Sequence, residues 1–351
     1  QNYLINSKII RHNVKTTFIL DRYQCVAIEN CFSSVAKVIS GVPQGSVLGP
    51  IHFIIFINDI DNVCYGRTSL KLFADDAKLY SEIDLNHSSS SLQTSLNNLA
   101  AWADAWQLLI NVEKCFVLST VRSKRSNQSI SNKYYLNGVL LTNNACVLDL
   151  GVTISPDLSY TTHVNNIVAK ALQRSSILFR GFASRNLKLL RKAFVTYIRP
   201  ILDYNSILWS PNLVYLIDLI ESVQRKFSKR IPSLSILPYS SRLNRLNLQP
   251  LELRRLHLDL INYYKILNGL SPLHPNDYFL IYSPITSTRS TTPSLLKPLR
   301  ASSNLSSFFS YRSVDAWNYL PPDVKLLTSF LAFKSAIKLV DLSAFLKCSF
   351  Y

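Results

Sequence analysis

The sequence has no methionine, only eight glycines and no long apolar run. The apolar stretch Phe53–Ile57 ends at Asn58, so it is far too short to cross a bilayer. The six cysteines are scattered, with no CxxC pair and no histidine at ligand spacing, which argues against a zinc site. The first 30 residues alternate apolar with charged groups and show no signal peptide. We therefore expect reduced, mostly buried thiols in an intracellular protein of the nucleus or cytoplasm, not a secreted or membrane one.

Acidic residues are also scarce. The chain has 38 Lys and Arg against 21 Asp and Glu, which gives a formal net charge of +17. Such a balance favours a polyanionic partner or an anionic membrane surface. With 48% hydrophobic residues, the 351 residues can bury a large core and form two or more compact regions.

Two adjacent aspartates stand out against this basic background. Asp75 and Asp76 lie between short apolar segments that predict the strands Leu70–Ala74 and Ala77–Tyr80. Two carboxylates at a hairpin tip repel each other, whereas a divalent cation such as Mg²⁺ would cancel that repulsion. A solvated turn is the alternative, since aspartate is favoured in turns. A metal-binding carboxylate pair in a strongly basic chain points to phosphoryl transfer on a nucleic acid.

A segment rich in glycine and proline, Ser40–Pro50, precedes the aspartates and holds three of the eight glycines. Glycine permits tight turns and a close approach of the backbone to a ligand, so this segment is either a loop or the start of a substrate-facing helix. The apolar residues that follow predict a buried helix over 48–60.

The rest of the chain changes character near residue 158. Before it, alternating strands and helices predict an α+β domain. The expected elements are strands at 24–28, 34–39 and 115–118, a strand pair formed by 139–141 and 146–154, and a helix at 92–106 with an apolar stripe. In that helix, Trp102 and Trp106 are better explained by core packing than by stacking on bases.

From residue 158 onward the pattern is helical. Helices are expected at 164–184, 187–198, 213–229 and 250–268. Residues 158–250 carry fourteen Lys and Arg but only three acidic residues. Contact with a phosphate backbone explains this excess better than solvated helix faces do, and would make binding steeply dependent on salt.

Taken together, the motifs resemble those of the reverse transcriptases of non-LTR (LINE-type) retrotransposons of the jockey or CR1 kind. Ser40–Pro50 followed by Phe73-Ala74-Asp75-Asp76 is similar to two motifs of that family. Further similar segments are the palm helix at Leu92–Ile110, the next motif at Asn111–Cys115, the primer-grip strand at Leu150–Val152 and the C-terminal region around Trp317–Pro321.

The resemblance implies a fold and a domain order. Residues 1–155 would form a partial right-hand polymerase palm and fingers, an antiparallel sheet with helices, that lacks the first catalytic-aspartate motif. Residues 156–270 would form a basic, mostly α-helical thumb. A Ser/Thr/Pro-rich linker at 271–310 and a helical tail at 311–351 would follow.

The resemblance also implies an activity, RNA-directed DNA polymerisation by two-metal nucleotidyl transfer. Its partners would be an RNA template, a DNA primer and deoxynucleoside triphosphates, and its cofactor Mg²⁺. The site residues carried over by motif position are the metal-binding Asp75 and the weaker Asp76; Phe73, Ala74, Pro43, Gln44 and Gly45 beside the nucleotide and template; Lys114 at the leaving pyrophosphate; and Leu150 and Gly151 at the primer end. The backbone-binding cations expected on the thumb are Arg191, Lys192, Arg225, Lys226, Lys229 and Arg230. A solvated surface lysine is the alternative for Lys114.

The chain also departs from the family pattern. Nothing in residues 1–39 matches the strand that carries the first metal-binding aspartate, and His52 stands where the family has an apolar residue. With no methionine and no amino-terminal endonuclease, we interpret the chain as the C-terminal piece of a longer polyprotein or as a decayed copy. We therefore expect little or no polymerase activity from the isolated chain. A non-catalytic nucleic-acid-binding remnant and a structural homo-oligomer are the alternatives.

Overall fold

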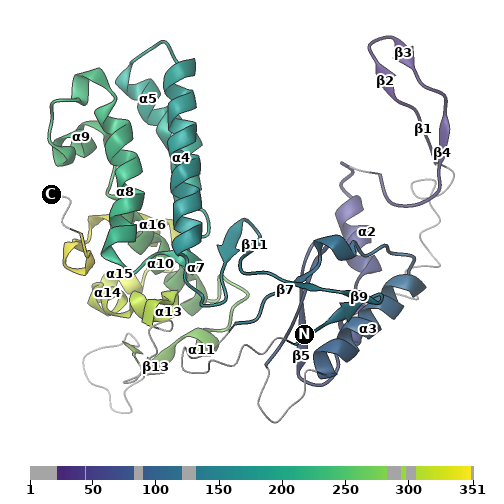
Figure 1. Ribbon diagram of the computed structural model, residues 1–351. Coiled ribbons are helices and arrows are strands. Elements are labelled where there is room, and N and C mark those ends of the chain that lie inside the picture. The colour runs from purple at the N-terminus through teal and green to yellow at the C-terminus, as the bar shows by residue number, and fades with distance from the viewer. Residues whose placement is uncertain are drawn as a thin grey trace. The chain divides into compact units, whose positions relative to one another are not determined.

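The computed structural model describes residues 22–43, 45–82, 90–120, 132–282, 294–297 and 306–348. The chain divides into two compact units, one of residues 1–117 and 127–143, the other of residues 118–126 and 144–351. Helices and small two-stranded sheets occur in both units, so the predicted mixed α+β class is confirmed (Figure 1). Within the described residues, no helix combines the length and the apolar character that crossing a membrane requires.

The first unit begins with an exposed hairpin. Strand β1 (Arg22–Gln24) pairs antiparallel with β4 (Ala36–Val38), and β2 (Ala27–Ile28) pairs with β3 (Cys31–Phe32). Strands β2 and β4 lie within the predicted strands 24–28 and 34–39, β1 overlaps the first of these only at Gln24, and β3 was not predicted.

The cysteines differ from the expectation of mostly buried thiols. All six are free, as predicted, but Cys25, Cys31 and Cys146 are exposed and the others are only partly covered. The prediction of burial was wrong because Cys25 and Cys31 lie on the exposed hairpin, where few side chains pack around them.

The predicted helix over 48–60 is shorter than expected and only partly buried. Helix α2 spans Gly49–Phe56, and a short 3-10 helix, η1 (Ile60–Val63), follows it. Phe56 packs edge-on against Trp106, whereas Ile51 and Ile54 are exposed. The prediction of burial was wrong because an apolar sequence alone does not supply partners for every side of a helix.

The centre of the first unit is a hairpin covered by a helix. Strands β5 (Thr68–Phe73) and β6 (Asp76–Ser81) pair antiparallel, and α3 (Ser90–Ala105) packs on them. The remaining strands are β7 (Phe116–Val117), β8 (Tyr135–Leu136), β9 (Val139–Leu140) and β10 (Thr142–Asn143), with β8 paired to β9 and β7 paired in parallel to β10. A small core forms around Leu96, Tyr134, Leu136 and Leu141.

Helix α3 is fixed by polar contacts as well as by its apolar stripe. Ser95 Oγ accepts a hydrogen bond from the Tyr65 backbone N–H at 2.9 Å, and Trp102 Nε1 donates to Asp59 Oδ1 at 3.1 Å. The rings of Trp102 and Trp106 lie 6.1 Å apart. Both tryptophans therefore serve packing, as the sequence predicts.

The second unit begins with a hairpin that the sequence assigned wrongly. Strand β11 (Val147–Asp149) pairs with β12 (Val152–Ile154), so residues 146–154 form a hairpin of their own instead of one strand paired with 139–141. The reason is a tight turn at Leu150 and Gly151, which both have positive φ, +44° and +82°.

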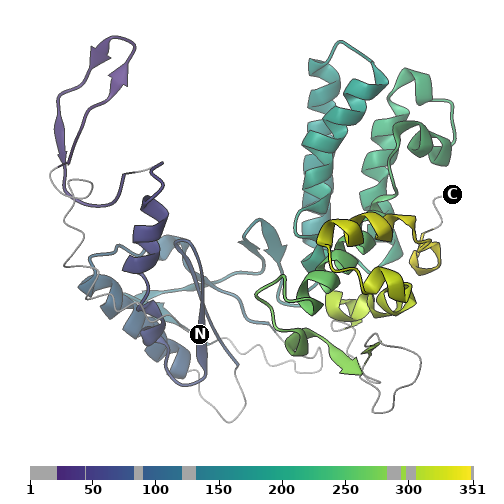
Figure 2. The same ribbon diagram turned by 180° about the vertical axis from the view of Figure 1, so that it is seen from behind.

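The helices predicted at 164–184, 187–198, 213–229 and 250–268 are confirmed close to these bounds, whereas the short helices at Arg199–Asp203, Ser206–Trp209 and Tyr239–Leu246 were not predicted. In chain order, these helices of the second unit are α4 (Thr161–Gly181), α5 (Leu187–Ala193) with a π-helical extension at Phe194–Ile198, α6 (Arg199–Asp203), α7 (Ser206–Trp209), α8 (Val214–Lys229), α9 (Tyr239–Leu246) and α10 (Leu251–Leu267). Asn186 caps α5 by accepting from the backbone N–H groups of Lys188 and Leu189. Helices α4 and α8 lie side by side in both views (Figures 1 and 2) and enclose a core with Phe194, Trp209 and Phe227.

A second core gathers the C-terminal elements around the far half of α10. These are α11 (Pro275–Tyr278), β13 (Leu280–Tyr282) paired with β14 (Ser294–Leu296), α13 (Phe309–Arg312), α14 (Val314–Tyr319), α15 (Pro322–Lys325) and α16 (Phe330–Ala336). Tyr263, Trp317 and Phe333 lie at its centre. Within the stretch predicted to be a linker, Leu295 of β14 is buried in this core and its backbone bonds to the Asn318 side chain in both directions.

Candidate active site and nucleic-acid interface

The predicted catalytic aspartates occupy the end of the β5–β6 hairpin. Phe73 pairs across the hairpin with Asp76, which leaves Ala74 and Asp75 as the two-residue tip. Asp76 is therefore the first residue of β6 rather than part of the tip, and it shares a face with Phe73 because directly opposed residues project to the same side. Phe73, Ala74, Asp75 and Asp76 are all exposed.

The tip is strained at Ala74. Its φ of +51° is a left-handed conformation, which costs a residue with a Cβ about 1–2 kcal/mol. A strained, exposed turn that presents carboxylates is the kind of feature found at functional sites.

The aspartate pair offers the type of ligand that a divalent cation binds, but fewer carboxylates than the expected site has. Carboxylate oxygens are the ligands that Mg²⁺ takes, and Asp75 and Asp76 offer two exposed carboxylates. Within the described parts of the chain, no group of three or more His, Cys, Asp or Glu lies together in a way that could hold a metal ion. The pair alone therefore does not complete the three-carboxylate site that the resemblance implies.

The glycine- and proline-rich segment is a loop that leads into α2. Gly41 and Gly45 have φ values of +78° and +79°, which favour glycine. Pro43 belongs to this loop, whereas Gln44 lies outside the described residues. The positions of Pro43 and Gly45 beside a nucleotide stay predictions.

Ser46 organises the end of this loop. Its hydroxyl donates to the Pro43 carbonyl at 2.7 Å and accepts from the Gly49 N–H at 3.0 Å, at the first residue of α2. A Cβ on Gly49 would lie 3.0 Å from Ser46 Oγ, so a larger residue here would require the Ser46 side chain to shift. Both sequence interpretations apply in part, since the segment is a loop that ends in a helix start.

Lys114 ends the 3-10 helix η2 (Val112–Lys114) just before β7. Its side chain is exposed, and it belongs to the same unit as the aspartate hairpin. Its predicted role at the leaving pyrophosphate stays a prediction.

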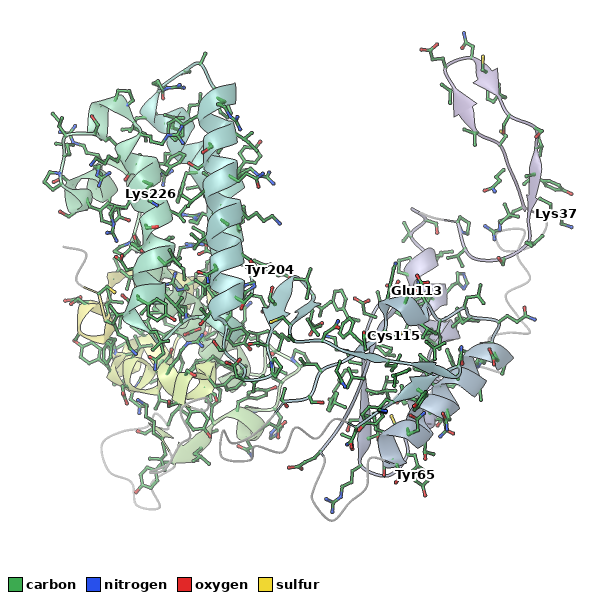
Figure 3. All side chains as sticks on the ribbon, viewed as in Figure 1. Lys37, Tyr65, Glu113, Cys115, Tyr204 and Lys226 are labelled. Carbon is green, nitrogen blue, oxygen red and sulfur yellow. The ribbon has the colours of Figure 1, made fainter. Side chains whose placement is uncertain are left out.

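The predicted primer-grip residues form the β11–β12 turn, in the second unit. Tyr204, which follows α6, donates its hydroxyl to the Leu150 carbonyl at 3.0 Å (Figure 3). Its ring lies against Gly151, where an added Cβ would be 3.2 Å from Cε1. Tyr204 thus contacts the turn with both its hydroxyl and its ring, a role the sequence did not reveal because 54 residues separate it from Leu150.

A histidine anchors the same hairpin. The backbone N–H of Thr153 donates to His163 Nδ1 at 3.1 Å, and the His163 ring lies 5.2 Å from that of Trp209. Burial lowers the pKa of His163, which keeps the ring neutral and able to accept this bond. His163 therefore has a structural role in this hairpin.

The six cations predicted to bind a nucleic-acid backbone have different surroundings. Arg191 donates to the carbonyls of Leu246 and Asn247 at the end of α9. Arg225 pairs with Asp218, whose hydrogen-bonded carboxylate raises the pKa of Arg225. Lys192 is exposed on α5. The other three, Lys226, Lys229 and Arg230, line one hollow.

A buried carboxylate lies in the middle of α8. Glu221 accepts hydrogen bonds from the Tyr239 hydroxyl and, at 2.7 Å, from the backbone N–H of Leu251 at the start of α10. Burial nevertheless raises the pKa of Glu221, with the fully buried Arg255 nearby. Polar residues such as Glu221 and Gln224 on the apolar stripe of the predicted helix were the available signal for this network.

Comparison with known proteins agrees with the motifs. Residues 6–182 match the family model described as reverse transcriptase (RNA-dependent DNA polymerase). The chain is 29% identical over 212 residues to the probable RNA-directed DNA polymerase from transposon BS of Drosophila melanogaster, covering 56% of this chain and 23% of that protein. It is 30% identical over 161 residues to the RNA-directed DNA polymerase from mobile element jockey of the same species, covering 44% of this chain and 17% of that protein.

A third relative extends farther along the chain. The probable RNA-directed DNA polymerase from transposon X-element of Drosophila melanogaster is 25% identical over 226 residues, covering 61% of this chain and 24% of that protein. The chain thus spans only about a fifth of the length of these curated relatives. No solved structure matches it. Because the family model covers half of the sequence, the chain belongs to the reverse transcriptase family, and the three relatives described above come from non-LTR transposons.

Proposed function

We propose that this chain is the part of an RNA-directed DNA polymerase that carries the metal-binding hairpin and a basic helical domain for the template–primer. The first unit would be the core of the palm and the helical unit the thumb. The observation that carries the proposal is the exposed carboxylate pair on a strained hairpin tip, inside the region that matches the reverse transcriptase family. The net charge of +17 supports nucleic acid as the partner. We place its action inside the cell, in the nucleus or cytoplasm.

The residues of this chain would divide the work. Asp75 and Asp76 supply oxygen ligands for Mg²⁺, which when bound neutralises charge on the reacting phosphate. Phe73, on the same face as Asp76, would contact the incoming nucleotide. Lys114 would donate a proton to the leaving pyrophosphate. The turn at Leu150 and Gly151, fixed by Tyr204, would contact the primer end.

A second candidate is a nucleic-acid-binding protein without catalysis. The observation that favours it is the incomplete carboxylate set among the described residues. On this view the basic helical unit binds a template–primer while the aspartate hairpin holds no metal.

The metal role of the hairpin separates these two candidates. We would titrate the purified chain with Mn²⁺ as a spectroscopic substitute for Mg²⁺ and follow free Mn²⁺ by electron paramagnetic resonance. We expect weak binding in the wild type, a loss of on the order of tenfold in Asp75→Asn, and no change in Asp104→Asn. Asp104 is the matched control because it is an exposed aspartate on α3 of the same unit. Equal Mn²⁺ binding in all three proteins would favour the second candidate.

Primer extension on an RNA template annealed to a DNA primer provides the second measurement. Because two carboxylates do not complete the site, we expect the isolated chain to bind the template–primer but to extend it little or not at all. Robust extension that Asp75→Asn abolishes would establish the enzyme and show that the chain completes its own site. Failure to bind any template–primer would overturn both candidates.

A further inference from the structure

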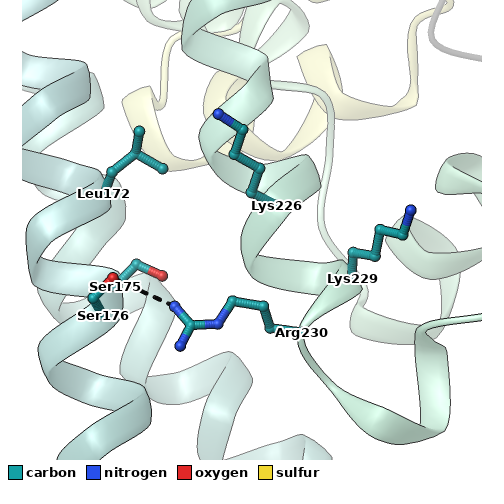
Figure 4. A pocket seen from close by; sticks show the side chains of 6 residues that line it. All are labelled: Leu172, Ser175, Ser176, Lys226, Lys229 and Arg230. Atoms are coloured by element: carbon teal, nitrogen blue, oxygen red, sulfur yellow. Dashed lines mark hydrogen bonds between the residues drawn. The ribbon is translucent and has the colours of Figure 1, made fainter.

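A hollow lies between α4 and α8 of the helical unit (Figure 4). Its volume is about 400 Å³. Leu172, Ser175 and Ser176 of α4 line one side, and Lys226, Lys229 and Arg230 at the end of α8 line the other. None of these six described residues is acidic, so the hollow presents three positive charges without a carboxylate among its lining residues.

Arg230 is held in place across this hollow. Its guanidinium carbon lies 4.3 Å from the centre of the Phe179 ring, and Nη1 lies 3.5 Å from Ser176 Oγ. Stacking on the ring uses the face of the guanidinium and leaves most of its N–H donors at the edge for a ligand. Because its position is fixed in advance, Arg230 loses little conformational freedom on binding.

The positive charge of the three cations exceeds the amount needed to balance the partial negative charge at the C-terminus of α8. Basic residues in a last turn stabilise a helix by facing the partial charge of about −0.5 at its C-terminus. Three lining cations at the end of α8 leave an excess of about 2.5 positive charges. An anion is the natural partner for this excess.

Two of the other predicted backbone contacts, Arg191 and Arg225, are occupied within the protein. Arg191 is bonded to two carbonyls at the end of α9, and Arg225 is paired with Asp218. Arg191 and Arg225 are thus bound within the protein, Lys226, Lys229 and Arg230 face a shared hollow, and Lys192 is exposed on α5.

We infer that the hollow between α4 and α8 is a binding site for backbone phosphates of an RNA–DNA template–primer. This inference rests on the proposed function and assigns its nucleic-acid contacts to particular residues. Arg230 binds a phosphate through its fixed fork, Lys226 and Lys229 contribute charges at the rim, and Leu172 offers an apolar wall to a sugar. Such contacts position the strand without reading its sequence.

The test is the salt dependence of binding. Fluorescence anisotropy would give the Kd of the full chain for a labelled RNA–DNA duplex in EDTA at several salt concentrations. Each phosphate contact contributes about 0.9 to the slope of log K against log salt. We expect Lys226→Ala, Lys229→Ala and Arg230→Ala each to lower the slope by about 1, and the triple variant to lose on the order of a hundredfold in affinity at low salt.

Two controls make the outcome specific. Lys334→Ala removes the same charge from an exposed position on α16 and should leave the slope unchanged. Arg230→Lys keeps the charge but not the fork and should restore the slope while affinity stays below wild type. Circular dichroism verifies that each variant is folded.

The results also separate this site from the proposed function. If the wild type binds the duplex but the triple variant keeps the wild-type slope, or if Lys334→Ala lowers it equally, the hollow is not the site. A loss seen only with the single-stranded RNA template would likewise overturn the duplex assignment. A wild-type chain that binds no nucleic acid would overturn the proposed function itself.

Discussion

The two units differ in how completely they cover their apolar side chains. The first unit has a small core around α3 and leaves Ile28, Phe32 and Ile54 exposed. The second has two large cores in which Trp209, Tyr263 and Phe333 are fully buried. The predicted catalytic hairpin thus lies in the unit with the small core. The six cations predicted to bind a nucleic-acid backbone lie in the unit with the two large cores.

The largest expected effect comes from deleting a phenylalanine in each unit. Phe227 is 1% exposed and packs within 5.0 Å of the rings of Phe179 and Phe194, whereas Phe73 is 62% exposed. Phe227→Ala should lower the free energy of unfolding by about 3–5 kcal/mol, because it leaves a cavity. Phe73→Ala should change it by less than about 0.5 kcal/mol. Urea denaturation followed by circular dichroism measures both.

A similar loss in the two variants would contradict the comparison between the units. It would mean that the Phe73 side chain contributes to stability as a packed residue does.

The second largest expected effect is a pH dependence of the stability of the second unit, caused by His257. Burial, with help from Lys338 and Arg254, lowers the pKa of His257 in α10 to about 4. The unfolded chain takes up a proton near pH 6.5, so the folded state is fully stabilised above that pH and loses stability as pH falls toward 4. Between pH 7 and pH 5 we expect His257 to account for a loss of up to about 2 kcal/mol. Urea denaturation of the wild type and of His257→Gln at both pH values checks this, and an identical pH dependence in the two would refute it.

The smallest expected effect concerns two glycines with nearly equal φ. Gly151 has φ +82° and lies against the Tyr204 ring, whereas Gly45 has φ +79° with nothing within 4 Å of an added Cβ. Alanine at either position costs about 1 kcal/mol for the left-handed backbone. Gly151→Ala should cost more because the Tyr204 ring must also move. The midpoint of urea unfolding compares the two, and adding Tyr204→Ala should reduce the difference if the ring is its cause.

Much of the fold could be predicted because a long helix has a periodic apolar pattern that is visible in the local sequence. The long helices α4, α8 and α10 follow apolar spacing that continues over several turns. The β11–β12 hairpin was missed because Leu150 adopts a left-handed conformation that its residue type disfavours. Only the partner, Gly151, carried a local signal for that turn.

The candidate site was predictable to the level of motifs but not of contacts. The aspartate hairpin was found, yet its tip is displaced by one residue because Ala74 accepts a positive φ. Arg191 read as a free cation, since the carbonyls it binds lie 55 and 56 residues away. Contacts between residues so far apart in the sequence arise from the packing of helices, and a local sequence pattern does not predict that packing.

Helix α10 takes part in both cores of the second unit. Leu251 at its start is buried with the first core, and Leu260, Tyr263 and Tyr264 are buried in the second. A helix shared in this way couples the two cores, because the loss of either core would leave part of α10 without its packing partners. Residues 144–351 should accordingly melt in a single cooperative step, with the fluorescence of Trp209 and Trp317 changing at the same temperature.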